Sequence, residues 1–210
     1  MDFPGNGPWW FRHSLLPEDR LTKAELRKEL RAKRRAHVAS LPENMRGLVF
    51  RRPPGAIAQL IPAGSTVGVY AEAPGEAPAS GYARWLYEAG HPIALPWFAA
   101  RDERMSFRLW DNPFDDDALE PGPWGMRQAD ASAATADPQV VFVPLVGFTA
   151  SGARLGMGAG HYDRWLAAHP DVLSIGLAWD CQEVVALPLK PHDRPLDAIV
   201  TPTRLLGPFA

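Results

Sequence analysis

The sequence contains a single cysteine, Cys181, and almost balanced charge, with 22 Lys and Arg against 24 Asp and Glu in 210 residues. One thiol excludes a disulfide scaffold. An apolar content of 46% excludes intrinsic disorder and collagen-like repetition. No apolar run reaches the length of a membrane span, and the first 20 residues carry Asp2, Glu18 and Asp19 without an apolar core. We therefore expect a cytoplasmic globular protein with neither a membrane span nor a secretory signal.

Proline and glycine, by contrast, are abundant, with 22 and 18 residues. This composition indicates many short connections and stiff loops. Residues 1–20, which include Pro4 and Pro8, are expected to form an irregular N-terminal extension. Because a chain of this length is typical of one domain, residues 21–210 are expected to form a single α/β domain.

Helical and strand patterns alternate along this domain. Helices are expected at residues 23–38, 80–89 and 161–168, with shorter ones at 56–60 and 183–187. Short apolar runs predict strands at residues 66–70, 92–95, 105–110, 140–144, 172–178 and 198–201, and residues 111–138 are expected to be mostly irregular. This alternation predicts a largely parallel open sheet with helices on both faces, a Rossmann-like three-layer fold.

In such a sheet, ligands bind in the loops beyond the carboxyl ends of the strands. The segments expected to carry the functional residues are therefore 71–77, 144–162, 179–183 and 190–197.

The positive charge is concentrated near the start of the chain. The first 54 residues carry 12 Lys and Arg against 6 Asp and Glu. Thr22 followed by Glu25 is a capping-box pattern that begins a basic helix. The cations of this helix are Lys23, Arg27, Lys28, Arg31, Lys33, Arg34 and Arg35. A basic helix is typical either of a protein with an anionic partner, such as nucleic acid, acidic lipid or a phosphorylated ligand, or of a solvated helix face.

A glycine-rich segment, Gly156-Met157-Gly158-Ala159-Gly160, lies between a predicted strand and a predicted helix. Glycines let a backbone approach phosphate oxygens, and a helix N-terminus offers free N–H groups. The segment is neither a Walker A loop nor the G-x-G-x-x-G dinucleotide fingerprint. Both a phosphate-binding loop and a tight strand-to-helix turn are consistent with it.

Two aspartates are candidate Mg²⁺ ligands. Asp163 lies in the first turn of the helix after the glycines, and Asp193 lies in a proline-bounded loop before the last strand. Mg²⁺ usually takes one or two protein carboxylates and completes its shell with phosphate and water oxygens. Each aspartate is also of the type found as a helix cap or turn residue, so the alternative role remains open.

Several segments, in the same order along the chain, resemble the 5-formyltetrahydrofolate cyclo-ligase family, also called methenyltetrahydrofolate synthetase. Near the N-terminus, residues 23–27 (KAELR) are similar to the family's opening Lys-x-x-Leu-Arg helix, and Pro74-Gly75-Glu76 is similar to its Pro-Gly-Glu segment. The remaining matches are residues 154–164, 176–182, 187–188 and 191–201. Together these motifs cover nearly the whole chain from residue 22 to 202.

The resemblance implies ATP- and Mg²⁺-dependent conversion of 5-formyltetrahydrofolate to 5,10-methenyltetrahydrofolate, with release of ADP and phosphate. It implies Glu76 and Arg154 as catalytic residues, and Asp163 and Asp193 as metal ligands. The residues implied to lie against the folate are Ala71, Glu76 and Trp124. Those implied to bind ATP are Lys23, Arg27, Arg154, Leu155, Gly156, Met157, Gly158, Ala159, Gly160, His161 and Tyr162.

The same resemblance sets expectations for the rest of the molecule. Arg31, Arg34 and Arg35 are left as solvated residues of the basic helix. The expected partners are ATP and 5-formyltetrahydrofolate, with no membrane, nucleic acid disfavoured, and a monomer or weak dimer as the assembly.

The sequence departs from the family pattern mainly on the folate side. Ala77-Pro78-Ala79 replaces the usual Val-Asp-Thr, and Gln128-Ala129 replaces Glu-Pro. In the glycine loop, Ala159 stands where Gly or Lys is usual, and His161 where Tyr is usual. Two alternatives to the cyclo-ligase are therefore a catalytically reduced regulator that binds folate or nucleotide, and an unrelated small-molecule kinase.

Overall fold

An eight-stranded sheet forms the centre of the molecule, with the strand order β12-β11-β10-β7-β1-β2-β3-β6. The computed structural model describes residues 21–42, 45, 48–190 and 193–209, so the expected N-terminal extension lies outside the described residues. The strands of this sheet are β1 (Val67–Gly68), β2 (Ile93–Trp97), β3 (Ser106–Leu109), β6 (Thr135–Ala136), β7 (Val140–Pro144), β10 (Leu173–Leu177), β11 (Ala198–Val200) and β12 (Leu205–Leu206). The five strands from β11 to β2 are parallel, and the others are antiparallel, which confirms the predicted sheet.

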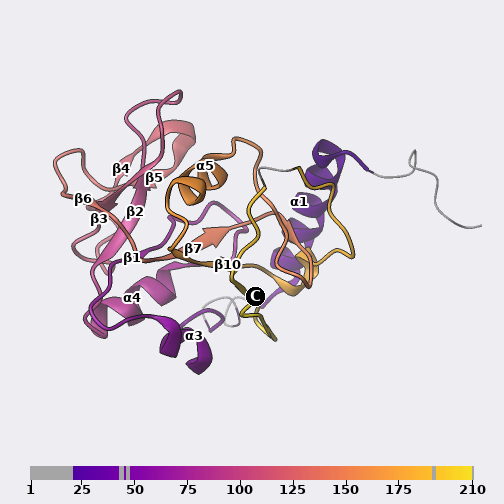
Figure 1. Cartoon of the computed structure of the whole chain (residues 1–210), viewed down its shortest axis with the longest axis horizontal. Helices are drawn as coiled ribbons and strands as arrows, with labels where there is room; N and C mark the ends of the chain where they lie inside the picture. Colours follow the sequence, from indigo (N-terminus) through magenta and orange to yellow (C-terminus); the bar gives the residue numbers. More distant parts are fainter. Residues whose placement is uncertain (1–20, 43–44, 46–47, 191–192, 210) are drawn as a thin grey trace, which may run out of the picture.

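Helices cover both faces of the sheet (Figure 1). Helices α3 (Gly55–Leu60) and α4 (Ser80–Glu88) lie on one face, and α5 (His161–Ala168) lies on the other. The side chains of β7 alternate between two cores. Val140 and Phe142 pack in the cluster that includes α3 and α4, whereas Val141 and Val143 pack in the cluster that includes α5. Because β7 is buried on both faces, its sequence is a continuous apolar run.

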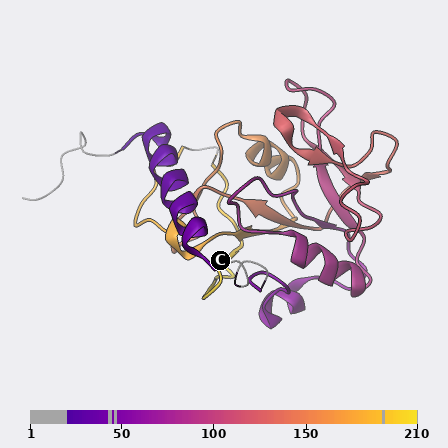
Figure 2. The same ribbon diagram turned by 180° about the vertical axis from the view of Figure 1, so that it is seen from behind.

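Helix α1 (Lys23–Ser40) lies at the end of the molecule opposite β3 and β6, as the two views in Figures 1 and 2 agree. It begins with the predicted capping box, in which the carboxylate of Glu25 accepts the backbone N–H of Thr22 at 2.8 Å and the Thr22 hydroxyl accepts the N–H of Glu25. Leu26 and Leu30 bury its apolar face in a third, small cluster with Val146 and Leu155.

A β-hairpin that was not predicted contributes Leu155 to this small cluster. Strands β8 (Gly147–Phe148) and β9 (Arg154–Leu155) pair antiparallel directly after β7, within the segment expected to be a loop. A Cβ atom at Gly147 would lie 2.5 Å from Cδ1 of Leu30, so glycine permits the close approach of α1. The hairpin therefore places α1 against the carboxyl end of β7.

The predicted helix at residues 183–187 was wrong. A single 3₁₀ turn, η4 (Asp180–Gln182), precedes it, and the chain then runs extended beside the hairpin. The backbone N–H of Val184 donates to the carbonyl oxygen of Phe148 at 2.8 Å, and the side chains of Val184 and Leu187 pack against the cluster under α1. These contacts replace the hydrogen bonds that a helix would have made.

The region expected to be irregular, residues 111–138, holds only short elements. They are β4 (Glu120–Pro121), η3 (Pro123–Gly125), β5 (Arg127–Gln128) and β6. No helix in the described part of the chain combines the length and apolar character that a bilayer crossing requires.

The order of the strands locates a crevice. The chain passes from β1 to β2 on one side, then adds β7, β10 and β11 on the other side of β1. In open α/β sheets, ligands bind at such a reversal, beyond the carboxyl ends of the two strands concerned. The loop after β1 and the hairpin after β7 flank this position.

Candidate active site

Two cations of α1 reach segments that follow sheet strands. Arg27 Nε donates to the carbonyl oxygen of Gly156 at 2.8 Å, and Lys23 Nζ forms an ion pair with Asp193. Gly158 has φ +117°, and a Cβ atom there would lie 3.4 Å from Cζ of Arg27. The structure thus brings together α1 and the glycine loop, which the resemblance assigned to ATP.

Arg154 is a buried link between the two predicted metal ligands. Its side chain is 4% exposed, its Nη2 donates to Oδ1 of Asp163 at 2.5 Å, and its Nη1 donates to the carbonyl oxygen of Arg194. Burial lowers the pKa of Arg154, whereas the negative charges of Asp163 and Asp193 raise it. A pocket of about 170 Å³ is lined by Arg154 and Asp193. The charges of both aspartates therefore act on Arg154, which lines a small cavity together with Asp193.

Asp163 and Asp193 fit a Mg²⁺ site only if a phosphorylated ligand supplies further oxygen atoms. Within residues 21–42, 45, 48–190 and 193–209, no group of three or more His, Cys, Asp or Glu side chains could hold a metal ion. The carboxylates of Asp163 and Asp193 are 26% and 14% exposed, so both reach the edge of the site. Mg²⁺ commonly binds through one or two carboxylates and takes its other oxygens from phosphates and water.

Three aromatic rings meet where the glycine loop enters α5. The ring centroid of His161 lies 4.7 Å from that of Phe98 and 5.2 Å from that of Trp124. Trp124 is 44% exposed and has φ +60°, a left-handed conformation that is uncommon for a residue other than glycine. Burial, followed by the charge of Arg164, lowers the pKa of His161 and favours its neutral form. The ring predicted to face folate is thus adjacent to the loop predicted to bind ATP.

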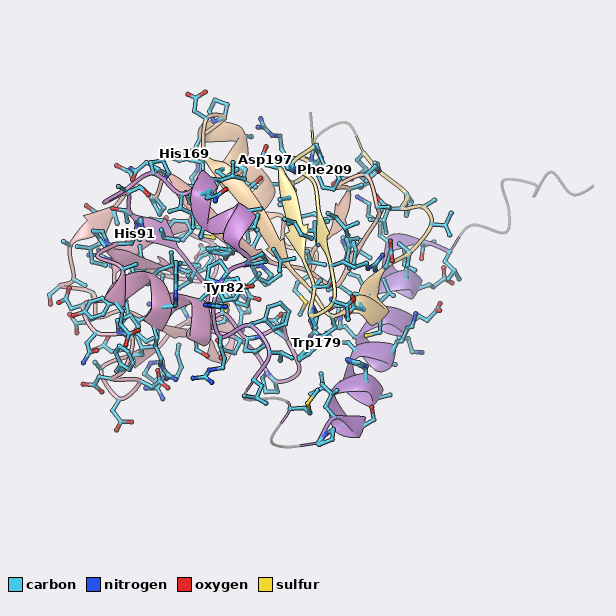
Figure 3. All side chains as sticks on the ribbon, turned by 90° about the horizontal axis from the view of Figure 1, so that it is seen from below. Tyr82, His91, His169, Trp179, Asp197 and Phe209 are labelled. Carbon is cyan, nitrogen blue, oxygen red and sulfur yellow. The ribbon has the colours of Figure 1, made fainter. Side chains whose placement is uncertain are left out.

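The loop after β1 is held in place by contacts to itself and to the end of β10. Oε2 of Glu76 accepts the backbone N–H of Ala73 at 3.0 Å, and the carbonyl oxygen of Gly75 accepts from Nε1 of Trp179 at 3.1 Å. Figure 3 shows Trp179 on the side of the sheet that faces α1, where its ring centroid lies 5.4 Å from that of His37. The loop is therefore fixed between the sheet and α1.

Arg34 reaches this loop from α1, so the expectation that it is solvated was wrong. The residue is 5% exposed, and its Nη1 lies 3.6 Å from Oε1 of Glu76, whose side chain is 9% exposed. The reason is helical geometry, because 11 residues make about three turns, which places Arg34 on the same face as Lys23. Arg35, one position further, is exposed as expected.

Glu76 is a buried carboxyl group with one nearby cation. Burial raises its pKa, the hydrogen bond from Ala73 and the charge of Arg34 lower it, and the charge of Glu72 raises it. The 3.6 Å separation between Arg34 Nη1 and Glu76 Oε1 is longer than a hydrogen bond, and the contact is an ion pair. Burial and the neighbouring donors therefore act on the pKa of Glu76 in opposite directions, and burial is the larger effect.

Tyr162 lies between the two halves of the site. Burial raises the pKa of its hydroxyl, the negative charge of Glu76 raises it further, and the positive charge of Arg154 lowers it. Its hydroxyl oxygen is buried, and no residue of the described chain forms a hydrogen bond with it. The charges of Glu76 in the β1 loop and of Arg154 in the hairpin therefore both act on the pKa of Tyr162.

A sequence model described as the 5-formyltetrahydrofolate cyclo-ligase family matches residues 19–202, which is most of the chain. The chain belongs to the 5-formyltetrahydrofolate cyclo-ligase family. A 5-formyltetrahydrofolate cyclo-ligase of Mycolicibacterium smegmatis is 29% identical over 193 residues, covering 87% of this chain and 95% of that relative. The Escherichia coli cyclo-ligase is 47% identical over 68 residues, and this alignment spans 31% of this chain but only 37% of the relative.

A solved structure supports the same assignment of the fold. The 5,10-methenyltetrahydrofolate synthetase of Aquifex aeolicus superposes with a TM-score of 0.68 and 26% identity, covering 90% of this chain and 93% of that chain. The fold of this chain thus matches that of a solved structure whose name denotes the same activity as the family.

The residues assigned by resemblance to this family gather at one edge of the sheet, with differences in exposure. Met157, Gly158 and Ala159 are exposed at the tip of the glycine loop, and Ala71 is half-buried. Leu155, by contrast, is 1% exposed and packs under α1, so only its backbone could contact a ligand.

A larger open groove of about 1260 Å³ lies elsewhere on the molecule. It is lined by residues 48–55, by part of α4, and by residues 200–202. None of the residues that the cyclo-ligase resemblance assigned lines this groove.

Proposed function

We propose that this protein is a 5-formyltetrahydrofolate cyclo-ligase that uses ATP and Mg²⁺ to form 5,10-methenyltetrahydrofolate. The observation that carries the proposal is the convergence of Arg154, Asp163 and Asp193 with Lys23 of α1, at the edge where Glu76 also lies. The names of the family relatives support this choice of reaction.

The reaction needs activation because a formyl amide is a poor electrophile. In the first step, the formyl oxygen attacks the γ-phosphorus of ATP, the bond to the β-phosphate oxygen breaks, and ADP leaves. N10 of the folate then attacks the formyl carbon and forms the new C–N bond. Phosphate departs with the former formyl oxygen, and N10 loses its proton. Catalysis of such a transfer consists mainly of positioning and of charge neutralisation.

The proposed ATP side supplies cations and backbone donors. Lys23 and Arg27 provide positive charge from α1, and the glycine loop brings N–H groups close to the phosphates. Arg154 holds Asp163 and the backbone at Arg194 in fixed positions. Mg²⁺, held by Asp163 and Asp193, would neutralise charge on the transferring phosphoryl group.

The proposed folate side supplies an acceptor and an aromatic surface. Glu76 is the proposed acceptor of an N–H of the substrate and, as the ring closes, of the proton of N10. Trp124 offers an exposed ring for stacking, and Ala71 lies at the start of the same loop as Glu76.

The proposal is tested by mixing purified protein with 5-formyltetrahydrofolate, Mg²⁺ and ATP and following the absorbance of the methenyl product. We expect product that depends on ATP and on Mg²⁺. Folate binding without turnover would instead indicate a regulatory protein, and ATP binding without folate binding would indicate a different kinase. Absence of product at high protein concentration would contradict the proposed activity.

A further inference from the structure

Arg34 carries buried hydrogen-bond donors that the rest of the described chain does not use. Its Nε and Nη1 atoms are buried, and neither has an acceptor among the described residues. A guanidinium group has five N–H donors, and burying donors without acceptors is destabilising. The ion pair with Glu76 at 3.6 Å is too long to serve as a hydrogen bond. These donors therefore point to a ligand oxygen.

The position of Arg34 along α1 assigns it to the folate side. Lys23 and Arg27 contact Asp193 and the glycine loop, on the proposed ATP side. Arg34 lies seven residues beyond Arg27, about 10 Å further along the helix axis. At that point the neighbour is Glu76, the carboxylate proposed to face the folate. A single helix face thus spans both substrates.

We infer that Arg34 is a substrate-binding residue that donates a hydrogen bond to a carbonyl oxygen of the bound folate, beside Glu76. This inference rests on the proposed function. Glu76 would repel an anionic ligand group placed between the two side chains, whereas a neutral carbonyl next to an N–H matches a donor and an acceptor that lie side by side.

The guanidinium shape matters for this role. A planar fork can stay beside Glu76 through one nitrogen and donate to the ligand through another, whereas the single ammonium of lysine is a compact point charge. Arg34→Lys should therefore keep the charge next to Glu76 and lose part of the folate affinity.

The experiment measures the affinities for 5-formyltetrahydrofolate and for Mg·ATP separately, by calorimetry, in the wild type and three variants. Arg34→Met keeps an apolar stem without charge, and Arg34→Lys keeps the charge. Arg35→Met removes the same charge from the adjacent, exposed position. We expect Arg34→Met to weaken folate binding by about tenfold or more, as for other hydrogen bonds to a charged group. Arg35→Met should leave folate binding unchanged, and Mg·ATP binding should be unchanged in all three variants.

A second ligand identifies the oxygen. Tetrahydrofolate retains the ring carbonyl and lacks the formyl group. If Arg34 donates to the formyl oxygen, Arg34→Met weakens binding of 5-formyltetrahydrofolate only. If it donates to the ring carbonyl, binding of both ligands weakens to a similar extent. Either result supports the inference.

The inference is overturned if Arg34→Met binds 5-formyltetrahydrofolate as tightly as the wild type does. If Arg34→Met fails to bind Mg·ATP, its fold is damaged, and Arg34→Lys provides the test instead. Folate affinity of Arg34→Lys equal to that of the wild type would then contradict the role. If the wild type binds and converts 5-formyltetrahydrofolate and the Arg34 variants bind it equally well, only the role of Arg34 is overturned. Wild-type protein that does not bind folate overturns both this role and the proposed function.

Discussion

Lys23 and Asp193 form an ion pair although 170 positions separate them in the sequence. The pair joins the first turn of α1 to the loop that precedes the last parallel strand. Both residues are proposed to meet Mg·ATP, the lysine through phosphate and the aspartate through the metal. In the structure each side chain neutralises the charge of the other, and in the proposed complex with Mg·ATP each would exchange this partner for the ligand.

The first prediction concerns this lysine. Lys23→Met should weaken Mg·ATP binding by on the order of tenfold, because a charge-assisted contact to phosphate is lost. Folate affinity should remain unchanged, since Lys23 lies on the other side of the site. Lys28→Met, which removes an exposed cation of the same helix, is the matched control. Equal losses of ATP affinity in both variants would show that general helix charge, and not this contact, is responsible.

The second prediction concerns the proposed metal ligand in α5. Asp163→Asn should raise the Mg²⁺ concentration needed for half-maximal activity while leaving folate affinity nearly unchanged, because the neutral amide binds Mg²⁺ more weakly. The assay is a Mg²⁺ titration at saturating ATP. Asp171→Asn, an exposed aspartate just beyond α5, serves as the control. A parallel loss of folate affinity in Asp163→Asn would argue against a metal role.

The third prediction concerns the packing of α1 against the small hydrophobic cluster beneath it. Leu30 is 2% exposed in the small cluster beneath the helix, so Leu30→Ala should reduce the free energy of unfolding by about 2–4 kcal/mol. Since α1 also carries Lys23 and Arg27, the KM for ATP should rise as well. Chemical denaturation and steady-state kinetics measure the two effects. Leu60→Ala, at a 40% exposed leucine of α3, should show neither.

The fourth prediction concerns pH. Burial raises the pKa of Glu76 and the charge of Arg34 lowers it, so Arg34→Met should raise this pKa further. In the proposed reaction, activity requires the Glu76 carboxylate and should fall as pH decreases through this pKa. The acidic limb of a kcat/KM profile should therefore move to higher pH in Arg34→Met.

The groups that face Glu76 limit how this shift is interpreted. Besides Arg34, they are Glu72 in the same loop and the hydroxyls of Tyr70 and Tyr162. None of these groups is altered in Arg34→Met, so a shift of the acidic limb would result from the loss of the Arg34 charge. Arg35→Met should keep the wild-type limb, and a shift of equal size there would point to the charge of the whole helix.

Much of the fold could be predicted because its signals are local. The capping box at Thr22 and the apolar run at residues 140–144 both mark elements that the structure confirms. The rule that ligands lie beyond parallel strands selected loops that follow β1, β7 and β10, since it depends on strand order and not on side-chain detail.

The burial of Arg34 could not be predicted from charge, because seven cations share α1 and only packing distinguishes them. A helical count from Lys23 places Arg34 on the site face, but the sequence does not show that the loop after β1 meets this face. The two-residue strands of the β8–β9 hairpin are likewise too short to show an alternating pattern.

The distance along the chain between Lys23 and Asp193 also bears on synthesis. At about 5–20 residues per second, a ribosome needs roughly 10 to 30 s to extend a chain from one residue to the other. For most of that interval α1 exists without the hairpin that helps to bury its leucines, and for all of it without the aspartate that pairs with Lys23. Its capping box and its strong helix formers give the nascent segment local stability while its tertiary partners are still being made.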